Sequence, residues 1–363
     1  MASLVLHEFH HSLRAQFAEL NSAEIVADYG DWLAEHAALH ETAGVIDLSF
    51  RSRICLIGAD RVRFLHGQAT NDVKKLCAGK GCYAAITTAK GKMESDLNIF
   101  ALTDELLLDF EPGLTEKISQ RLERFIVADD VQIVDAAPHY GLLSVQGSKA
   151  AEVVRALNLF PEIPVAQFNS VKISDATLGE VYLTNNPRLG TSGFDLFVPN
   201  NSLGAVADKL IAAAKAVGGR AVGWQAFETA RIEVGIPRFG ADMDETNIPL
   251  ECGIESRAIV YNKGCYIGQE VINRIHSVGH VTRELRGLHL ADDLENLPQK
   301  HDKLFHAGKE VGYLTSAVKS PSLNANIALG YVRREANQIG NELTLRTATG
   351  ESPAKIVELP LVK

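Results

Sequence analysis

The chain has 363 residues, with 36 Lys and Arg against 45 Asp and Glu, so its formal net charge is −9. Hydrophobic residues make up 46% and charged residues 22% of the sequence, a balance that excludes disordered and fibrous classes and, with this length, predicts two or three globular domains. No apolar run approaches the roughly 20 residues of a membrane helix, and the acidic total disfavours a broad nucleic-acid surface.

Residues 1–50 are predicted to form a mainly helical entry segment. The segment lacks basic residues ahead of its first apolar stretch, so it is not a secretory signal, and we expect a cytoplasmic protein. Its His7–His11 stretch fits the pattern H-E-x-x-H. A zinc protease needs that pattern on a buried helix with a third ligand, and chain ends usually fray, so we expect no metal here.

The cysteines support a reducing compartment. The five are odd in number and widely scattered, and no C-x-x-C spacing occurs. We therefore expect reduced thiols and neither a zinc knuckle nor a four-cysteine cluster site.

An internal repeat organises the next 230 residues. A short apolar strand, a glycine turn and a helix occur around Gly58 and again around Gly147, and a strand ending in proline before a helix occurs at Pro112 and Pro199. The two displacements, about 89 and 87 residues, are nearly equal. Two landmarks in register indicate a duplicated unit.

Each unit follows the order strand, helix, strand, strand, helix, strand, which is ferredoxin-like. We place the first unit at residues 51–136 and the second, with an added helix near 225–234, at residues 137–280. The helices are indicated by apolar spacings that define one face: Ile118, Leu122 and Phe125 in the first unit, and Val206, Leu210 and Ile211 in the second.

From residue 281 the pattern changes to short alternating strands separated by glycine turns. Expected strands lie at 285–290, 304–306, 311–317, 327–332, 342–346 and 354–359. Many short strands at regular spacing favour a small antiparallel barrel over residues 281–363.

The most unusual stretch runs from Asn262 to Arg274, where two glycines flank a Cys-Tyr-Ile step before an expected helix. A Cys265 thiol near Lys263 and a helix N-terminus would have a lowered pKa, because positive charge stabilises the thiolate. Alternatively, the segment is a glycine-shaped turn in which the cysteine packs as a small hydrophobe. The chemistry alone does not choose between the two interpretations.

The octapeptide K-G-C-Y-I-G-Q-E at 263–270 resembles the signature of the YgfZ-type folate-binding proteins, which are relatives of the glycine-cleavage T-protein, an aminomethyltransferase. Further motifs of the family occur in order at 44–49, 231–240, 249–251 and 312–316. The resemblance implies an α+β fold in which two ferredoxin-like units form a duplicated T-protein-like folate-binding core, followed by a C-terminal antiparallel β-barrel. The motif residues that it singles out are Lys263, Gly264, Cys265, Tyr266, Gly268, Gln269 and Glu270.

The resemblance also implies the residues that hold a tetrahydrofolate. A carboxylate accepts the paired N–H donors of a pteridine edge, and Asp195 stands at the family's G-x-E position unless it is only a polar residue on an exposed strand face. Arg231 would contact the folate, or form a structural ion pair with Glu228 or Glu233. Tyr83 and Asp96 complete the site, and Lys263 and Arg274 would attract the anionic glutamyl tail.

One departure concerns mechanism. T-proteins carry an Asp-Asp pair after a glycine-rich hairpin, and here the matching residues are Ser95 and Asp96. Serine cannot supply the charge of a carboxylate, which argues against aminomethyl transfer.

The resemblance therefore favours a tetrahydrofolate-binding accessory protein that supports iron–sulfur cluster assembly or repair and, through client enzymes, tRNA modification. Cys265 would be its reactive thiol. The alternative is a folate-dependent aminomethyltransferase or demethylase that uses Asp96, and a direct tRNA-binding protein is disfavoured by the net charge. Expected partners are folate and iron–sulfur client or assembly proteins, without nucleic acid or membrane, and the protein is expected to be a monomer.

Overall fold

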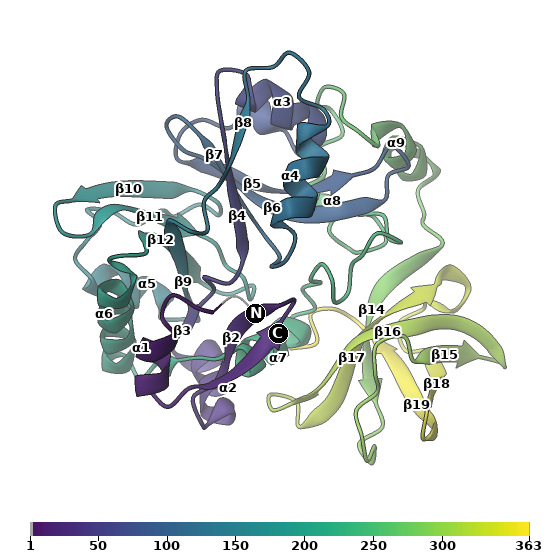
Figure 1. Ribbon diagram of the computed structural model, residues 1–363. Helices are drawn as coiled ribbons and strands as arrows, with labels where there is room; N and C mark the ends of the chain where they lie inside the picture. The colour runs from purple at the N-terminus through teal and green to yellow at the C-terminus, as the bar shows by residue number, and fades with distance from the viewer. Residues whose placement is uncertain (1–2, 363) are drawn as a thin grey trace. The chain divides into compact units, whose positions relative to one another are not determined.

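A computed structural model describes residues 3–362 and divides the chain into two compact units. The first unit runs to Ala84 and then from Ser95 to Phe227, and the second holds Ala85–Glu94 and continues from Glu228. The division thus falls after Phe227 and around a hairpin tip at residues 85–94, and the predicted boundaries 136/137 and 280/281 stay predictions. Figure 1 traces the chain through both units.

The first repeat is a five-stranded sheet in the order β5-β6-β7-β4-β8, and β4 pairs antiparallel with both β7 and β8. Its four strands β8-β4-β7-β6 have the predicted ferredoxin-like arrangement, and β5 is an additional strand at the edge that the predicted order did not contain. The elements are β4 (Ser52–Ile57), α3 (Arg61–Gln68), a 3-10 turn at Val73–Lys75, β5 (Lys80–Thr87), β6 (Met93–Ala101), β7 (Leu106–Phe110), α4 (Thr115–Glu123) and β8 (Gln132–Asp135).

The second repeat is a six-stranded sheet in the order β10-β11-β12-β9-β3-β13. Strand β3 comes from the N-terminal segment and lies between β9, its antiparallel partner, and β13, its parallel partner. The elements are β3 (Gly44–Asp47), β9 (Tyr140–Gln146), α5 (Ala150–Ala156), β10 (Ser170–Asp175), β11 (Gly179–Asn185), β12 (Gly193–Pro199), α6 (Leu203–Ala216) and β13 (Arg220–Ala221).

Residues 3–50 are not mainly helical, so this prediction was wrong. They form α1 (His7–Ser12), a hairpin of β1 (Gln16–Leu20) and β2 (Ala23–Asp28), α2 (Trp32–Glu41) and β3. His7 and His11 lie on the six-residue helix α1, but the buried histidine there is His10, whose Nε2 lies 2.9 Å from Asp47 Oδ2.

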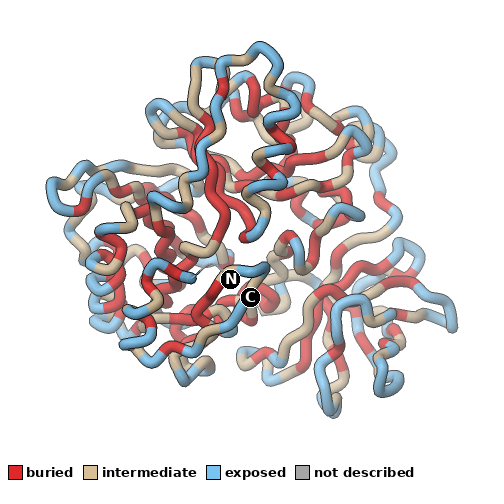
Figure 2. Tube along the Cα trace, viewed as in Figure 1, coloured by how far each residue is buried: buried red, intermediate tan, exposed pale blue. Residues whose placement is uncertain are grey.

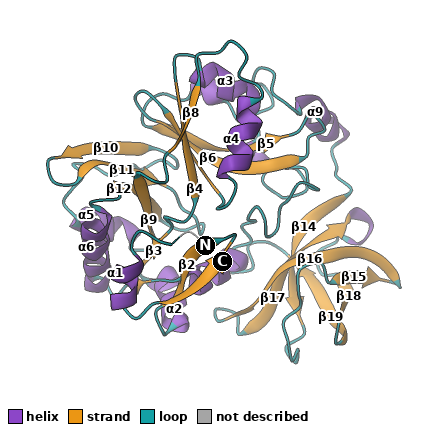
Figure 3. Cartoon of the chain, viewed as in Figure 1, coloured by secondary structure: helices purple, strands orange, loops and turns teal. Residues whose placement is uncertain are grey.

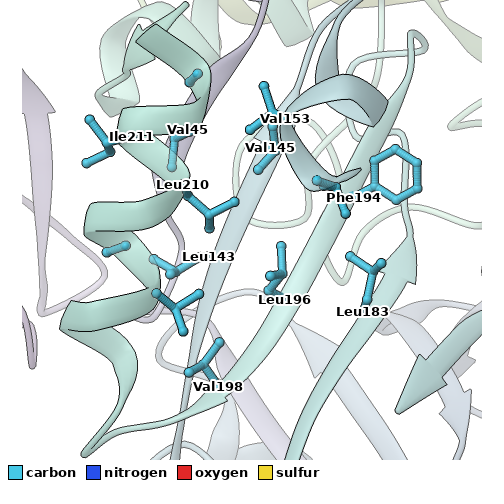
Figure 4. Packing of buried hydrophobic residues seen from close by; sticks show 14 of the residues in the cluster. Val45, Leu143, Val145, Val153, Leu183, Phe194, Leu196, Val198, Leu210 and Ile211 are labelled. Carbon is cyan, nitrogen blue, oxygen red and sulfur yellow. The ribbon is translucent and has the colours of Figure 1, made fainter. Parts of the chain in front are cut away.

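Strand alternation places different side chains on the helix-covered and the helix-free face of each sheet. In β12, Phe194, Leu196 and Val198 pack under α5 and α6, so Asp195 points to the opposite face. Figure 4 shows this apolar layer, in which Leu210 of α6 lies over strand residues such as Leu143. The predicted helix faces are confirmed except at Phe125, which lies beyond the end of α4 and is exposed.

The barrel of the second unit is closed, with strand order β14-β17-β16-β15-β18-β19 and β19 paired back to β14. All six predicted strands occur, and Figure 3 shows them in orange. The remaining elements of this part of the chain are α7 (Trp224–Glu233), which spans the division, α8 (Glu255–Ala258), α9 (Gln269–Val278), β14 (Arg283–Leu290), β15 (Lys303–His306), β16 (Lys309–Ser320), β17 (Ala325–Arg333), a 3-10 turn at Arg334–Ala336, β18 (Glu342–Thr347) and β19 (Gly350–Val357).

Buried residues are concentrated along the strands, whereas many loop residues are exposed (Figure 2). Within residues 3–362, no helix combines the length and apolar character needed to cross a membrane.

Candidate functional site

The polar part of the first unit begins on strand β6, whose burial alternates residue by residue. Asp96 and Asn98 share one half-exposed face, about 7 Å apart along the strand. The Tyr83 hydroxyl on β5 donates a 2.8 Å hydrogen bond to Oδ2 of Asp96. The structure therefore brings together two predicted site residues, a buried phenol and a reachable carboxylate.

Ser95 lies on the other face of the same strand. It is fully buried, and its hydroxyl donates to the backbone carbonyl of Asp96. A side chain at position 95 points away from the face that carries Asp96 and Asn98. The serine therefore leaves the carboxylate on the reachable face in place, which weakens the mechanistic objection drawn from the sequence.

Asn98 is hydrogen-bonded to a network of buried charged groups. Its side-chain amide donates to Oδ2 of Asp109 at 2.9 Å, and the same oxygen accepts from Nη2 of Arg188 at 2.8 Å. Asp109 is fully buried, and Nε of Arg51 donates to its other oxygen. Burial alone would raise the pKa of Asp109, but the two guanidinium groups outweigh it and hold the pKa far below its usual value.

Asp195, the predicted pteridine acceptor, is joined to this network. It is fully buried and not on an exposed strand face, and Arg188 and Asn186 both donate to its carboxylate. Its role as the direct acceptor stays a prediction. Sequence reasoning missed Arg188, Asp109 and Asn186, although Arg188 and Asn186 lie only seven and nine positions before Asp195.

In the second unit, Arg231 is buried in an ion-pair cluster. Its guanidinium donates to Glu228 and Asp242, and Asp242 also accepts the hydroxyls of Thr315 and Ser316 on β16. The predicted alternative, an ion pair with Glu228, is therefore present. Glu233 is engaged elsewhere, by the hydroxyls of Ser320 and Ser322.

The octapeptide forms a turn that leads into α9, as predicted. Gly268 precedes the helix with φ +90°, and the Thr87 hydroxyl donates to the carbonyl of Ile267 at 2.7 Å. A Cβ on Gly268 would lie 2.6 Å from the Thr88 carbonyl oxygen. Both the backbone conformation and the hairpin tip therefore require glycine at this position.

The side chains of the octapeptide take different positions. Cys265 is exposed, and within residues 3–362 its thiol makes no hydrogen bond. The Lys263 ammonium lies 4.9 Å from the centre of the Tyr266 ring, a cation–π contact. Burial raises the pKa of Tyr266 to about 12. Gly264, Glu270 and Arg274 are exposed, whereas Gln269 is half-buried in the first turn of α9.

A cavity of about 340 Å³ also opens in the first unit. It lies between the helix-free faces of the two sheets, and Cys55 and Leu107 of the first sheet meet Tyr182 and Phe197 of the second there. None of the predicted site residues lines it, so we do not assign it to the same site.

The two ferredoxin-like sheets and the closed barrel together define a T-protein-like fold. The chain shares this fold with the solved glycine cleavage system aminomethyltransferase T from Bartonella henselae, with a TM-score of 0.87 and 21% identity over 99% of this chain and 98% of that one. Residues 6–263 match the model of the GCVT N-terminal domain, and residues 283–363 match the glycine cleavage T-protein C-terminal barrel domain. The chain therefore belongs to the glycine-cleavage T-protein family.

Curated relatives are similar over nearly the whole length. An aminomethyltransferase from Listeria monocytogenes is 25% identical over 359 residues, covering 99% of this chain and 97% of the relative. An aminomethyltransferase from Halalkalibacterium halodurans is 27% identical over 348 residues, covering 93% and 94%. The name of these relatives matches aminomethyl transfer, which the sequence offered as the alternative function.

Proposed function

We propose that the protein binds a reduced folate and carries out one-carbon group transfer of the aminomethyltransferase or demethylase kind, with Asp96 as the acid–base residue. The observation that supports this proposal best is the half-exposed Asp96 carboxylate, which the Tyr83 hydroxyl holds from a neighbouring strand. The names of the full-length relatives point the same way.

The burial pattern on β6 weakens the main objection to this function. The family's first aspartate position is occupied by Ser95, which is buried on the opposite face of the strand and bonded to backbone. The carboxylate on the reachable face is retained. We therefore prefer group transfer to the accessory role that the sequence favoured.

The polar groups of the first unit are suited to a folate. Asp96 offers a carboxylate that accepts or returns a proton, and Tyr83 keeps one of its oxygens oriented. Arg188 offers a fixed donor in the network that it forms with Asn98 and Asp109, and Asn98 shares the face of β6 that carries Asp96. Tetrahydrofolate would supply the nitrogen that takes up the one-carbon unit.

Turnover of N-methylated and aminomethyl-bearing amines with tetrahydrofolate tests this proposal. Asp96→Asn keeps the shape of the side chain and can still accept from Tyr83, but it cannot take a proton. We expect the variant to fold normally and to lose about 10²- to 10⁴-fold in turnover. Equal turnover in the two proteins would contradict the role of Asp96.

The octapeptide supports a second candidate, the YgfZ-type accessory protein that acts on iron–sulfur enzymes in the cytoplasm. Cys265 is exposed at the start of a turn that the hairpin tip holds in place, so a client protein or a sulfur carrier can reach its thiol. A strain with weak iron–sulfur enzyme activity, complemented with wild type or Cys265→Ala, tests this role. Full complementation by the variant would exclude the thiol from it.

A further inference from the structure

The carboxylate expected to accept the pteridine edge already has its donors. Asp195 has no exposed surface, and its Oδ2 accepts from Asn186 Nδ2 at 2.8 Å. Nε of Arg188 lies 3.2 Å from Oδ1 and 3.0 Å from Oδ2. A ligand edge with two N–H donors would have to displace Arg188 from the buried Asp195 carboxylate. This exchange is costly because it breaks a buried ion pair and leaves the Asp195 carboxylate without its cation.

Arg188 is itself fixed on two further sides. Its Nη2 donates to Asp109, and its backbone N–H donates to Oε1 of Gln146 at 2.9 Å. Burial lowers the pKa of Arg188, but the carboxylates of Asp195 and Asp109 more than offset this effect, and the net result is a raised pKa. The guanidinium is therefore a permanent cation in one orientation.

The third nitrogen of this guanidinium, Nη1, is available to a ligand. Within residues 3–362, no group accepts a hydrogen bond from Nη1, and the Arg188 side chain is 10% exposed, whereas the side chains of Asp195 and Asp109 are fully covered. The group that this network offers to a ligand is a charged donor and not a carboxylate.

We infer that Arg188 reads the ligand at this position, through an acceptor oxygen, and that Asp195 and Asp109 are positioning residues that hold its guanidinium. This inference rests on the proposed folate function. The oxygen belongs either to the pteridine 4-oxo group or to a glutamyl carboxylate of the tail, and the two sources can be separated by ligand chemistry.

Binding of three ligands to the full-length protein, measured by calorimetry, tests this inference. Tetrahydrofolate carries both oxygens, its 4-amino-4-deoxy analogue replaces the pteridine acceptor with a donor, and tetrahydropteroate lacks the glutamyl group. A hydrogen bond from a charged donor contributes about 1.5–3 kcal/mol, so we expect one analogue to bind about 10- to 100-fold more weakly than tetrahydrofolate. The weaker analogue identifies the oxygen.

Arg188→Gln alone would leave a buried carboxylate without its cation, so the matched variant is Arg188→Gln/Asp195→Asn, which removes both charges together. Arg188→Lys keeps the charge but not the fork. We expect the double variant to bind tetrahydrofolate about 10- to 100-fold more weakly and to lose the discrimination between analogues, and Arg188→Lys to lie between it and wild type.

Three results would overturn the inference. If wild type binds all three ligands equally, Arg188 reads neither oxygen. If the double variant binds tetrahydrofolate as tightly as wild type, or binds when wild type does not, Arg188 only blocks Asp195, and the folate function is retained. If neither protein binds any of the ligands, the folate function itself fails and this inference with it.

Discussion

At the level of single residues, the proposed chemistry depends on which face of a strand each side chain occupies. Asp96 and Ser95 are neighbours in sequence, yet one is half-exposed beside Tyr83 and the other is fully buried. Reading the pair as two equivalent positions suggested a damaged active site. The alternation of β6 shows that only Asp96 lies on the face shared with Asn98.

Restoring the family's first aspartate should therefore harm the protein. Ser95→Asp would place an unpaired carboxylate in a fully buried position, and we expect a loss of several kcal/mol in the free energy of unfolding and no gain in turnover. Denaturant unfolding measures the first quantity, with Ser95→Ala as a control that should cost only about 1 kcal/mol. A stable and more active Ser95→Asp variant would contradict the assignment of faces.

Glu228 gives the protein a contribution to stability that depends on pH. Burial alone would raise its pKa, but the guanidinium groups of Arg231 and Arg238 lower it from 4.5 to about 2. Because the pKa is depressed on folding, the contribution is present above pH 4.5 and is lost as the pH falls toward 2.

Glu228→Gln removes this contribution. We expect the variant to be less stable at pH 7, by on the order of 1–3 kcal/mol, and its stability to fall less steeply than that of wild type between pH 4.5 and 2. Unfolding curves at several pH values measure both effects. Parallel curves for the two proteins across that range would be incompatible with a charged Glu228.

Several residues of the candidate site could be singled out from the sequence, and so could one partner, Glu228 of Arg231, but not the partners of Asp195. Asp96, Asp195 and Arg231 stand out because they fall in recognisable motifs. Arg188, Asp109 and Asn186 do not. Asn186 binds Asp195 from nine positions away without a recognised motif, and Arg188 meets Asp109 only when β7 and the segment before β12 are brought together. A contact between residues 79 positions apart leaves no local pattern in a single sequence.

At the scale of elements, glycine positions explain how the octapeptide is held. Gly268 and Gly279 bound helix α9, and both have left-handed backbone conformations, with φ +90° and +80°. A side chain at Gly268 would collide with the hairpin tip, whereas one at Gly279 would meet nothing within 4 Å. Both positions therefore require a left-handed backbone conformation, but only Gly268 is also closely packed.

Alanine at each position separates these effects. Gly279→Ala should cost about 1–2 kcal/mol, the penalty for a left-handed residue. Gly268→Ala should cost clearly more, because the Thr88 carbonyl must also move. Thermal or denaturant unfolding of both variants makes the comparison. Equal losses would mean that the hairpin tip does not restrict Gly268.

The strands of the barrel were all predictable, since each is a short alternating run between turns. Strand β3 was not, because its four residues carry no signal that they insert between β9 and β13, about 100 and 180 residues away. The placement of such a strand is decided by the gap in the sheet that it fills. Residues 3–50 were misread as mainly helical because β3 was missed and because the local hairpin of β1 and β2 was missed as well.

At the scale of the whole molecule, the second unit is built from two distant parts of the chain. Residues 85–94 belong to it with the chain from Glu228 onward. Met93 N–H donates to the Asn247 carbonyl at 3.0 Å, and Thr87 donates to Ile267. The octapeptide is therefore supported by a hairpin that lies about 180 residues earlier.

Thr87→Val keeps the shape of the side chain and removes the hydroxyl that reaches Ile267. We expect a loss of about 1 kcal/mol in global stability. We also expect amide hydrogen exchange to become faster than in wild type, and more so in helix α9 than in the barrel strands. Mass-spectrometric exchange of the full-length variant measures this pattern. Unchanged exchange in α9 would show that the hairpin does not support the octapeptide.

The duplication, the barrel and the family resemblance were all accessible from the sequence. The T-protein family is confirmed over most of the chain, whereas the YgfZ-type branch stays a prediction. Group transfer was the less favoured function from the sequence, because Ser95 replaces the first aspartate of the family's Asp-Asp pair. The relatives and the burial pattern of β6 both favour it. Both candidate functions share one claim, which is that the protein binds a folate.

Titration of tetrahydrofolate into the full-length protein by calorimetry, without oxygen, tests that claim most directly. The account predicts saturable binding of one tetrahydrofolate per chain. A titration with no saturable heat at any tetrahydrofolate concentration up to the millimolar range, by a protein shown to be folded, would contradict it.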